Sequence, residues 1–69
     1  MKRRPVDSRA INSIGYDREH ATLEIEFVDG DVYQYFLVPA SVHRQFLAAE
    51  SMGNYFAAHI RNRYEYRRI

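Results

Sequence analysis

The strongest constraint on this chain is a pair of strand-forming segments joined by a tight turn. In Leu23–Phe27, apolar residues alternate with glutamates, so the three apolar side chains share one face of an extended segment. Asp29-Gly30 follows, a dipeptide that strongly favours a hairpin turn. Val32–Val38 then supplies the β-branched and aromatic side chains that strands prefer. The sequence therefore predicts an antiparallel hairpin.

The length of the hairpin loop decides which face two tyrosines take. A two-residue loop puts Tyr33 and Tyr35 on the face of the glutamates. A three-residue loop with a bulge at Gly30 moves both tyrosines to the apolar face and keeps Gln34 out of the core. We favour the second register for that reason, and both registers require a positive φ at Gly30.

Shorter elements flank the hairpin. Ala10–Tyr16 reads as a short strand in which Gly15 is a bulge or the strand end. Residues 1–8 show little periodicity, so we expect a frayed N-terminal arm. The folded domain is then expected to cover residues 9–69.

The C-terminal half predicts two helices. Pro39 ends the preceding strand because it has no N–H to donate, and Ala40–Ala49 has helical spacing of apolar residues. A break at 51–53 separates this helix from a second one, over about Asn54–Arg63. The tail 64–69 alternates, which is typical of a final strand or an extended arm.

Together these elements predict one α+β domain, because 69 residues form a single domain at most. We expect a three-stranded antiparallel meander packed against two C-terminal helices, with the tail as a candidate extra strand. The expected core consists of Leu23, Ile25, Phe27, Phe46, Phe56 and Ile60.

Charge is unevenly distributed although the net charge is only +1. Residues 1–10 and 59–69 are basic, and residues 17–31 are acidic. If the chain ends lie together, as domain termini often do, they could form one basic patch. The alternative, which we favour slightly, is that both ends are solvated and pair loosely with the acidic hairpin.

The sequence also narrows location and chemistry. It has no cysteine, which excludes disulfides and thiolate metal sites, and no apolar run near the ~20 residues that span a membrane. The basic start is followed by polar residues and not by the apolar segment of a secretion signal. We therefore expect a cytoplasmic protein that does not enter a membrane.

No catalytic or cofactor motif is apparent. His20, His43 and His59 lie on separate predicted elements, so they do not predict a metal site. Glu24 and Glu26 are explained more simply as a solvated strand face than as an acid–base pair. Phosphate-binding glycine motifs and nucleophile elbows are missing. We expect a non-enzymatic protein with no cofactor, no metal and no evident small-molecule substrate.

The C-terminal segment carries the candidate binding residues. Arginine can grip phosphates and tyrosine can stack on bases, and the segment interleaves the two. The residues are Arg61, Arg63, Tyr64, Tyr66, Arg67 and Arg68. In the simpler alternative, Tyr64 packs on the second helix while the arginines face water. Tyr33 and Tyr35 form an alternative stacking face, although we favour burial for them in so small a domain.

The ordered set of these short motifs resembles the KTSC domain, over about residues 7 to 66. The matching runs are Ile14-Gly15-Tyr16-Asp17, Leu23-x-Ile25-x-Phe27-x-x-Gly30, Tyr33-Gln34-Tyr35, Val38-Pro39, Ser51-x-Gly53-x-Tyr55-Phe56 and Ile60-Arg61-x-x-Tyr64. That domain occurs at the C-terminus of some lysyl-tRNA synthetases and as short stand-alone bacterial proteins, which this chain is similar to. The resemblance implies a suggested role in RNA binding and brings no catalytic residues with it.

Our functional hypothesis from the sequence is a small binding module whose partner is RNA. The alternative is a protein-interaction adaptor, or a homodimer formed through a sheet edge or an aromatic patch.

Overall fold

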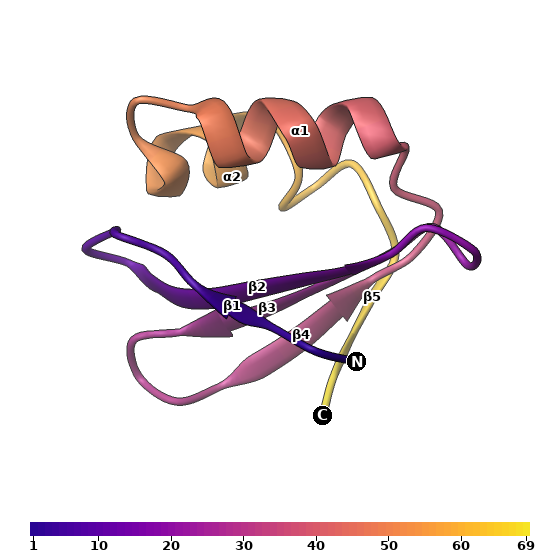
Figure 1. Cartoon of the computed structure of the whole chain (residues 1–69), viewed down its shortest axis with the longest axis horizontal. Coiled ribbons are helices and arrows are strands. Elements are labelled where there is room, and N and C mark those ends of the chain that lie inside the picture. Colours follow the sequence, from indigo (N-terminus) through magenta and orange to yellow (C-terminus); the bar gives the residue numbers. More distant parts are fainter.

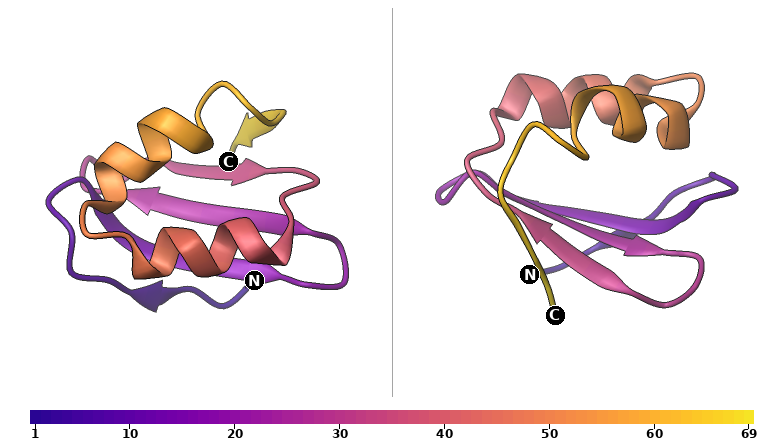
Figure 2. Two further views of the ribbon diagram at one scale, coloured as in Figure 1. Left: turned by 90° about the horizontal axis from the view of Figure 1, so that it is seen from above. Right: turned by 180° about the vertical axis from the view of Figure 1, so that it is seen from behind.

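The computed structural model describes residues 1–69 as an antiparallel sheet with two helices on one face (Figures 1 and 2). The strands are β1 (Arg4–Pro5), β2 (Ile11–Asp17), β3 (Thr22–Phe27), β4 (Val32–Tyr35) and β5 (Tyr66–Arg68), and the helices are α1 (Ala40–Ala48) and α2 (Met52–His59). The strands lie in the order β1-β2-β3-β4-β5. The predicted α+β class is confirmed, with β2, β3 and β4 as the meander and β5 as the extra C-terminal strand.

The hairpin adopts the register with the three-residue loop. Ile25 pairs with Tyr33, and the Phe27 amide donates to the Asp31 carbonyl at 2.9 Å. Gly30 has a φ of +94°, the left-handed region that favours glycine, and its amide donates to the Phe27 carbonyl at 2.9 Å. Tyr33 therefore shares the inner face of the sheet with Ile25, as the favoured register predicted.

Gly15 is neither a bulge nor a strand end. It pairs with Glu24 inside β2, and the irregularity in this strand falls earlier, between Ile11 and Ser13. A Cβ atom at Gly15 would lie 2.8 Å from the carbonyl oxygen of Lys2. Glycine is needed here because the N-terminal segment passes close over it, a long-range cause that the local sequence does not reveal.

The N-terminal arm is held to the sheet, in contrast to the fraying expected for residues 1–8. Arg4 and Pro5 pair with Ile14 and Ser13 to form β1. The Arg3 guanidinium anchors the arm, because its Nε donates to Ser13 Oγ at 3.0 Å and its Nη1 forms an ion pair with Glu24.

A polar network on the outer face of the sheet explains why this anchor holds. Glu24 is only 4% exposed, so it is not the solvated residue that we expected. Besides Arg3, its carboxylate accepts from Gln34 Nε2 at 2.9 Å. Ser13 Oγ in turn donates to Glu26 at 2.9 Å. A buried carboxylate needs such partners, and the arm supplies the charged one.

The second helix begins and ends earlier than expected. Ser51 is its N-cap, with Oγ accepting from the Asn54 amide at 3.2 Å, so Gly53 lies in the first turn and is not a break. The helix ends at His59, and the C-cap residue Ile60 is fully buried. Arg61 and the residues after it are therefore turns rather than helix.

The core lies between the helices and the inner face of the sheet. Its buried members are Ile11, Ile14, Leu23, Ile25, Tyr35, Val38, Phe46, Met52, Phe56 and Ile60. The expected core is confirmed except for Phe27, which is half-buried at the rim. Neither helix is long and apolar enough to cross a membrane.

The basic ends of the chain are not neighbours in the sheet. They carry β1 and β5, which form opposite edges with three strands between them. The strand order therefore does not place the two basic ends side by side.

Candidate binding cleft

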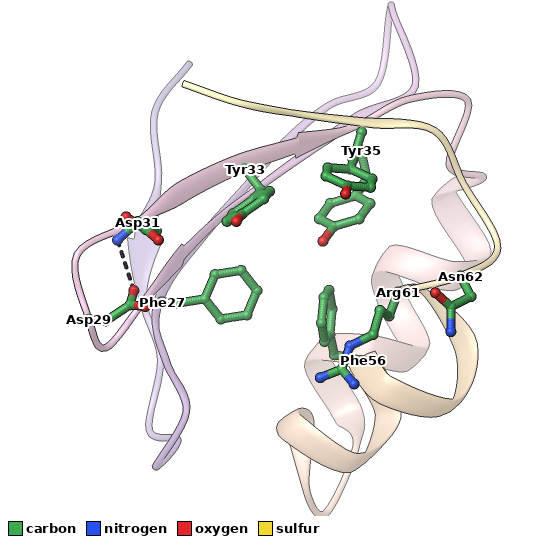
Figure 3. Close-up of a pocket in the computed structure, with 9 residues that line it drawn as sticks. Phe27, Asp29, Asp31, Tyr33, Tyr35, Phe56, Arg61 and Asn62 are labelled. Carbon is green, nitrogen blue, oxygen red and sulfur yellow. Dashed lines mark hydrogen bonds between the residues drawn. The ribbon is translucent and has the colours of Figure 1, made fainter.

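An open cleft of about 410 Å³ lies where the hairpin end, β5 and the segment after α2 meet. Figure 3 shows side chains of the sheet and of α2 converging on it. We call it the aromatic cleft, and its lining residues are Phe27, Asp29, Asp31, Tyr33, Tyr35, Phe56, Arg61, Asn62 and Tyr66.

Strand pairing brings three tyrosines to the same face. Tyr35 lies opposite Tyr66 in the β4–β5 pair, and directly opposed residues of an antiparallel pair point to the same side. The ring of Tyr66 lies 5.6 Å from that of Tyr35 and 5.7 Å from that of Tyr33. Tyr66 is 59% exposed, so its ring is an exposed aromatic surface beside the half-buried ring of Tyr33.

Two phenylalanines complete the floor through edge-to-face contacts. The Phe27 and Tyr33 ring centroids are 5.7 Å apart at 83°, and those of Phe27 and Phe56 are 5.2 Å apart at 70°. Tyr35 meets Phe56 at 5.6 Å and 78°. Such contacts are favourable between aromatic quadrupoles and fix the ring orientations.

The mouth of the cleft carries both signs of charge. The Arg61 guanidinium carbon lies 5.6 Å from the centre of the Phe56 ring, a cation–π distance. On the hairpin side, Asp29 accepts a hydrogen bond from the Asp31 amide at 2.9 Å (Figure 3). Asp31 forms a 3.8 Å ion pair with Arg68. A bound molecule would meet Arg61 on one side, and on the other the two carboxylates, one of them paired with Arg68.

The innermost tyrosine stays uncharged over the physiological range. The pKa of Tyr35 is raised to about 12, mainly by burial and in smaller part by Tyr33 and Tyr66, against the opposing effect of Arg61. Its hydroxyl is therefore a neutral hydrogen-bonding group at the base of the cleft.

The structure unites two sets of residues that the sequence offered as alternatives. Arg61 and Tyr66 from the C-terminal set line the same cleft as Tyr33 and Tyr35 from the hairpin set. Arg68 borders the cleft through its ion pair with the hairpin.

The remaining predicted binding residues lie elsewhere. Arg63 and Tyr64 line a separate hollow of about 230 Å³, where half-buried Tyr64 packs against the core. Arg67 pairs with Gln34, so it lies on the outer face of the sheet with Glu24. The C-terminal segment is therefore split among three surfaces.

Sequence reasoning missed five members of the cleft. The sequence places Phe27 and Phe56 in the core, Asp29 and Asp31 at the end of the hairpin, and Asn62 in the second helix. The aspartates could have been found, because the favoured hairpin register already places them at the end of the inner face. The contribution of Asn62 depends on where α2 ends, which the apolar spacing misjudged.

The three histidines lie on different elements of the fold. His20 contacts Asp17 at 2.8 Å, His43 stacks on Tyr16 with centroids 4.5 Å apart, and His59 is at the end of α2. No three His, Cys, Asp or Glu side chains gather closely enough to hold a metal ion.

The sequence model of the KTSC domain matches residues 7–64 of this chain. The chain belongs to the KTSC domain family. A crystal structure of a KTSC domain protein from Yersinia pestis superposes with a TM-score of 0.93 and 42% identity, covering 99% of this chain and 96% of that one. The KTSC fold is thus the arrangement of sheet and helices described above.

Relatives include both small proteins and parts of larger ones. The chain is 43% identical over 56 residues to an uncharacterised protein of Stutzerimonas stutzeri, covering 81% of this chain and 79% of that protein. It is 33% identical over 63 residues to a lysine–tRNA ligase of Nostoc punctiforme, covering 91% of this chain but only 11% of the ligase.

The Tyr-x-Tyr run that carried the KTSC resemblance now has a structural meaning. Tyr35 is buried in the core, while Tyr33 is half-buried and forms part of the cleft wall. The pair therefore links the core of this KTSC domain to its aromatic cleft.

Proposed function

We propose that this KTSC domain is a non-enzymatic module that binds single-stranded RNA by stacking a base in the aromatic cleft. The observation that carries the proposal is the exposed ring of Tyr66, held beside Tyr33 and next to the cation Arg61. Base–aromatic stacking contributes about 1–3 kcal/mol per base and accepts any base. An aromatic surface that is partly exposed to solvent in a preformed cleft offers that stacking without rearrangement.

The charges suggest how a nucleotide would be oriented. Arg61 can attract the phosphates, while Asp29 and Asp31 repel them and Asp31 already engages Arg68. The backbone would therefore run along the side formed by β5 and the segment after α2. A base pointing toward the hairpin could donate its amino group to a carboxylate, which favours cytosine, adenine or guanine over uracil.

Relatives give the proposal associational support. Proteins named lysine–tRNA ligase, from Nostoc punctiforme and Trichormus variabilis, contain a similar stretch that amounts to about a tenth of their length. Their name places a tRNA among the molecules they act on. This association supports RNA as the partner, although a function must be argued from the site itself.

The decisive experiment measures the affinity for a labelled single-stranded RNA at about 50 mM salt, where electrostatic attraction is strong. We expect Tyr66→Ala to weaken binding by roughly 5- to 100-fold, the equivalent of losing one stacked base. Tyr66→Phe keeps the ring and should bind nearly as well as the wild type. Leu37→Ala, which truncates another exposed side chain outside the cleft, is the matched control.

Two results would refute the proposal. One is the absence of RNA binding at this salt concentration. The other is an affinity of Tyr66→Ala equal to that of Leu37→Ala, because the cleft would then have no part in binding.

One observation favours a second candidate, a protein partner. Aromatic rings beside Asp29 and Asp31 are also a suitable environment for a lysine or arginine side chain, through cation–π and ionic contacts. Binding of that kind would survive salt better than RNA binding. Self-association through a sheet edge is disfavoured, since β1 is two residues long and ends at Pro5, and β5 carries Arg67 and Arg68.

A further inference from the structure

Two neighbouring hollows lie on either side of a stacked pair of rings, Tyr16 and His43. One hollow, of about 370 Å³, receives Lys2 and Arg4 from the N-terminal arm. The other, of about 310 Å³, receives Arg18 and Arg44. Tyr16 and His43 line both hollows. We call this surface the basic groove, and it shares no residue with the aromatic cleft.

The charge of the basic groove is not balanced by neighbouring acids. Neither hollow has an aspartate or glutamate in its lining, whereas each of the other three hollows has at least one, namely Asp29 and Asp31, Asp7 and Glu50, or Glu65. None of the four cations forms a salt bridge. Four cations without a salt-bridge partner, on a chain of net charge +1, make a local positive field that favours an anionic ligand.

Tyr16 and His43 form the floor of the basic groove, and contacts with neighbouring segments fix their position. The Tyr16 hydroxyl donates to the Val38 carbonyl, and its ring stacks on His43 with an interplanar angle of 15°. Burial, with Arg44 beside it, lowers the pKa of His43, so the imidazole is neutral near pH 7. The close passage of the arm over Gly15 places Lys2 and Arg4 on the opposite wall. The four cations therefore come from three segments: the arm, the turn after β2, and α1.

We propose that the basic groove binds the phosphates of an RNA backbone, as a second contact separate from the aromatic cleft. The choice of RNA rests on the proposed function, while the preference for phosphate rests on the groove alone. Guanidinium groups such as those of Arg18 and Arg44 bind phosphate oxygens in pairs, with a geometry that a single lysine lacks. The cleft would then supply base stacking, and the groove sequence-independent attraction.

The phosphate chemistry can be tested without any base. Inorganic tripolyphosphate is titrated into the full chain while the ring signals of Tyr16, His43 and Tyr66 are followed by NMR. We expect saturable shifts of Tyr16 and His43 and no shift of Tyr66. Arg44→Glu should abolish the shifts. Arg9→Glu makes the same charge change outside the groove and should leave them nearly intact.

The RNA assignment is tested by salt dependence. For single-stranded RNA, each phosphate contact adds about 0.7 to the slope of log affinity against log salt. Arg18→Glu and Arg44→Glu should each weaken binding and flatten this slope by about that amount, and Arg9→Glu should change it less. Circular dichroism melting curves would verify that all three variants are folded.

The outcomes separate this inference from the proposed function. If tripolyphosphate moves no groove signal, the groove is not a phosphate site, and if both groove variants bind RNA like Arg9→Glu, the groove does not contact RNA, whatever Tyr66→Ala shows. If vesicles with 30% phosphatidylserine bind through Arg18 and Arg44 at a salt concentration where RNA does not, the partner is a lipid surface and the RNA assignment is wrong. If RNA shifts Tyr16 and His43 but not Tyr66, the groove is confirmed and the cleft proposal fails.

Discussion

Gly15 is required by a close approach of two backbone segments rather than by a turn. We predict that Gly15→Ala pushes the N-terminal arm away, because the new Cβ would lie 2.8 Å from the Lys2 carbonyl oxygen and 3.1 Å from Arg3 Cγ. Arg3 would then lose its ion pair with buried Glu24. The expected loss is about 1–3 kcal/mol of unfolding free energy, measured by chemical denaturation.

A second glycine provides the control for this prediction. Gly53 lies in the first turn of α2, and a Cβ there would make an ordinary 3.4 Å contact with Ala10. Gly53→Ala should be neutral or stabilising by up to about 1 kcal/mol, since alanine favours helix. Equal stability of the two variants would contradict the role that we assign to Gly15.

The raised pKa of Tyr35 predicts that the protein loses stability at high pH. Its folded-state pKa is about 12, above the ordinary value of 10. The folded state therefore holds this proton more tightly, and its contribution is complete below pH 10 and is lost as the pH rises toward 12. The contribution to stability is on the order of 2–3 kcal/mol.

The measurement is the free energy of unfolding between pH 9 and pH 12. Tyr35→Phe should remove much of the decline. Tyr66→Phe should keep most of it, because Tyr66 raises the pKa of Tyr35 less than burial does. A decline of the same size in all three proteins would show that Tyr35 is not its source.

At the scale of elements, the hairpin depends on the backbone conformation of Gly30. Its φ is +94° and no atom lies within 4 Å of the position that a Cβ would occupy, so any cost of substitution is conformational rather than steric. We predict that Gly30→Ala costs about 1–2 kcal/mol, that Gly30→Val costs more, and that Gly30→Asn costs least because asparagine tolerates this region. Thermal denaturation that ranks valine at or above asparagine would contradict the turn assignment.

The hairpin also shows what could be predicted from sequence. Its register follows from local facts, the Asp-Gly turn and the polarity of Gln34, and the structure confirms it. The N-terminal arm does not follow from local facts. It is held by an ion pair between Arg3 and Glu24 and by the missing side chain of Gly15.

The aromatic cleft could be predicted only in part from the sequence. The sequence identified Tyr33, Tyr66 and Arg61 as candidates, but as members of separate surfaces. They meet only because β5 pairs with β4, across about thirty residues of chain that include both helices. Alternation in a six-residue tail predicts a strand, but it does not name the neighbour of that strand.

At the scale of the whole molecule, the core and the cleft are one packing unit. Phe56 is buried, yet its ring contacts Phe27 and Tyr35 in the cleft and lies under Arg61. We predict that Phe56→Ala costs about 3 kcal/mol or more. That is a large fraction of the stability of so small a domain.

Melting curves would measure this cost. Leu47→Ala, which truncates an apolar helical side chain that is about half exposed, should cost less than about 1 kcal/mol. An unchanged melting temperature for Phe56→Ala would mean that the core does not extend to the cleft.

The position of the chain ends has a practical consequence for labelling. Arg4 of the first strand borders the basic groove, and Tyr66 of the last strand borders the aromatic cleft. A tag or dye fused to either end would therefore shield one of the surfaces whose occupancy it should report. The chain has no cysteine, so Ala57→Cys would create a unique thiol on the exposed side of α2, outside every hollow of the molecule. A fluorophore attached there would leave both surfaces open.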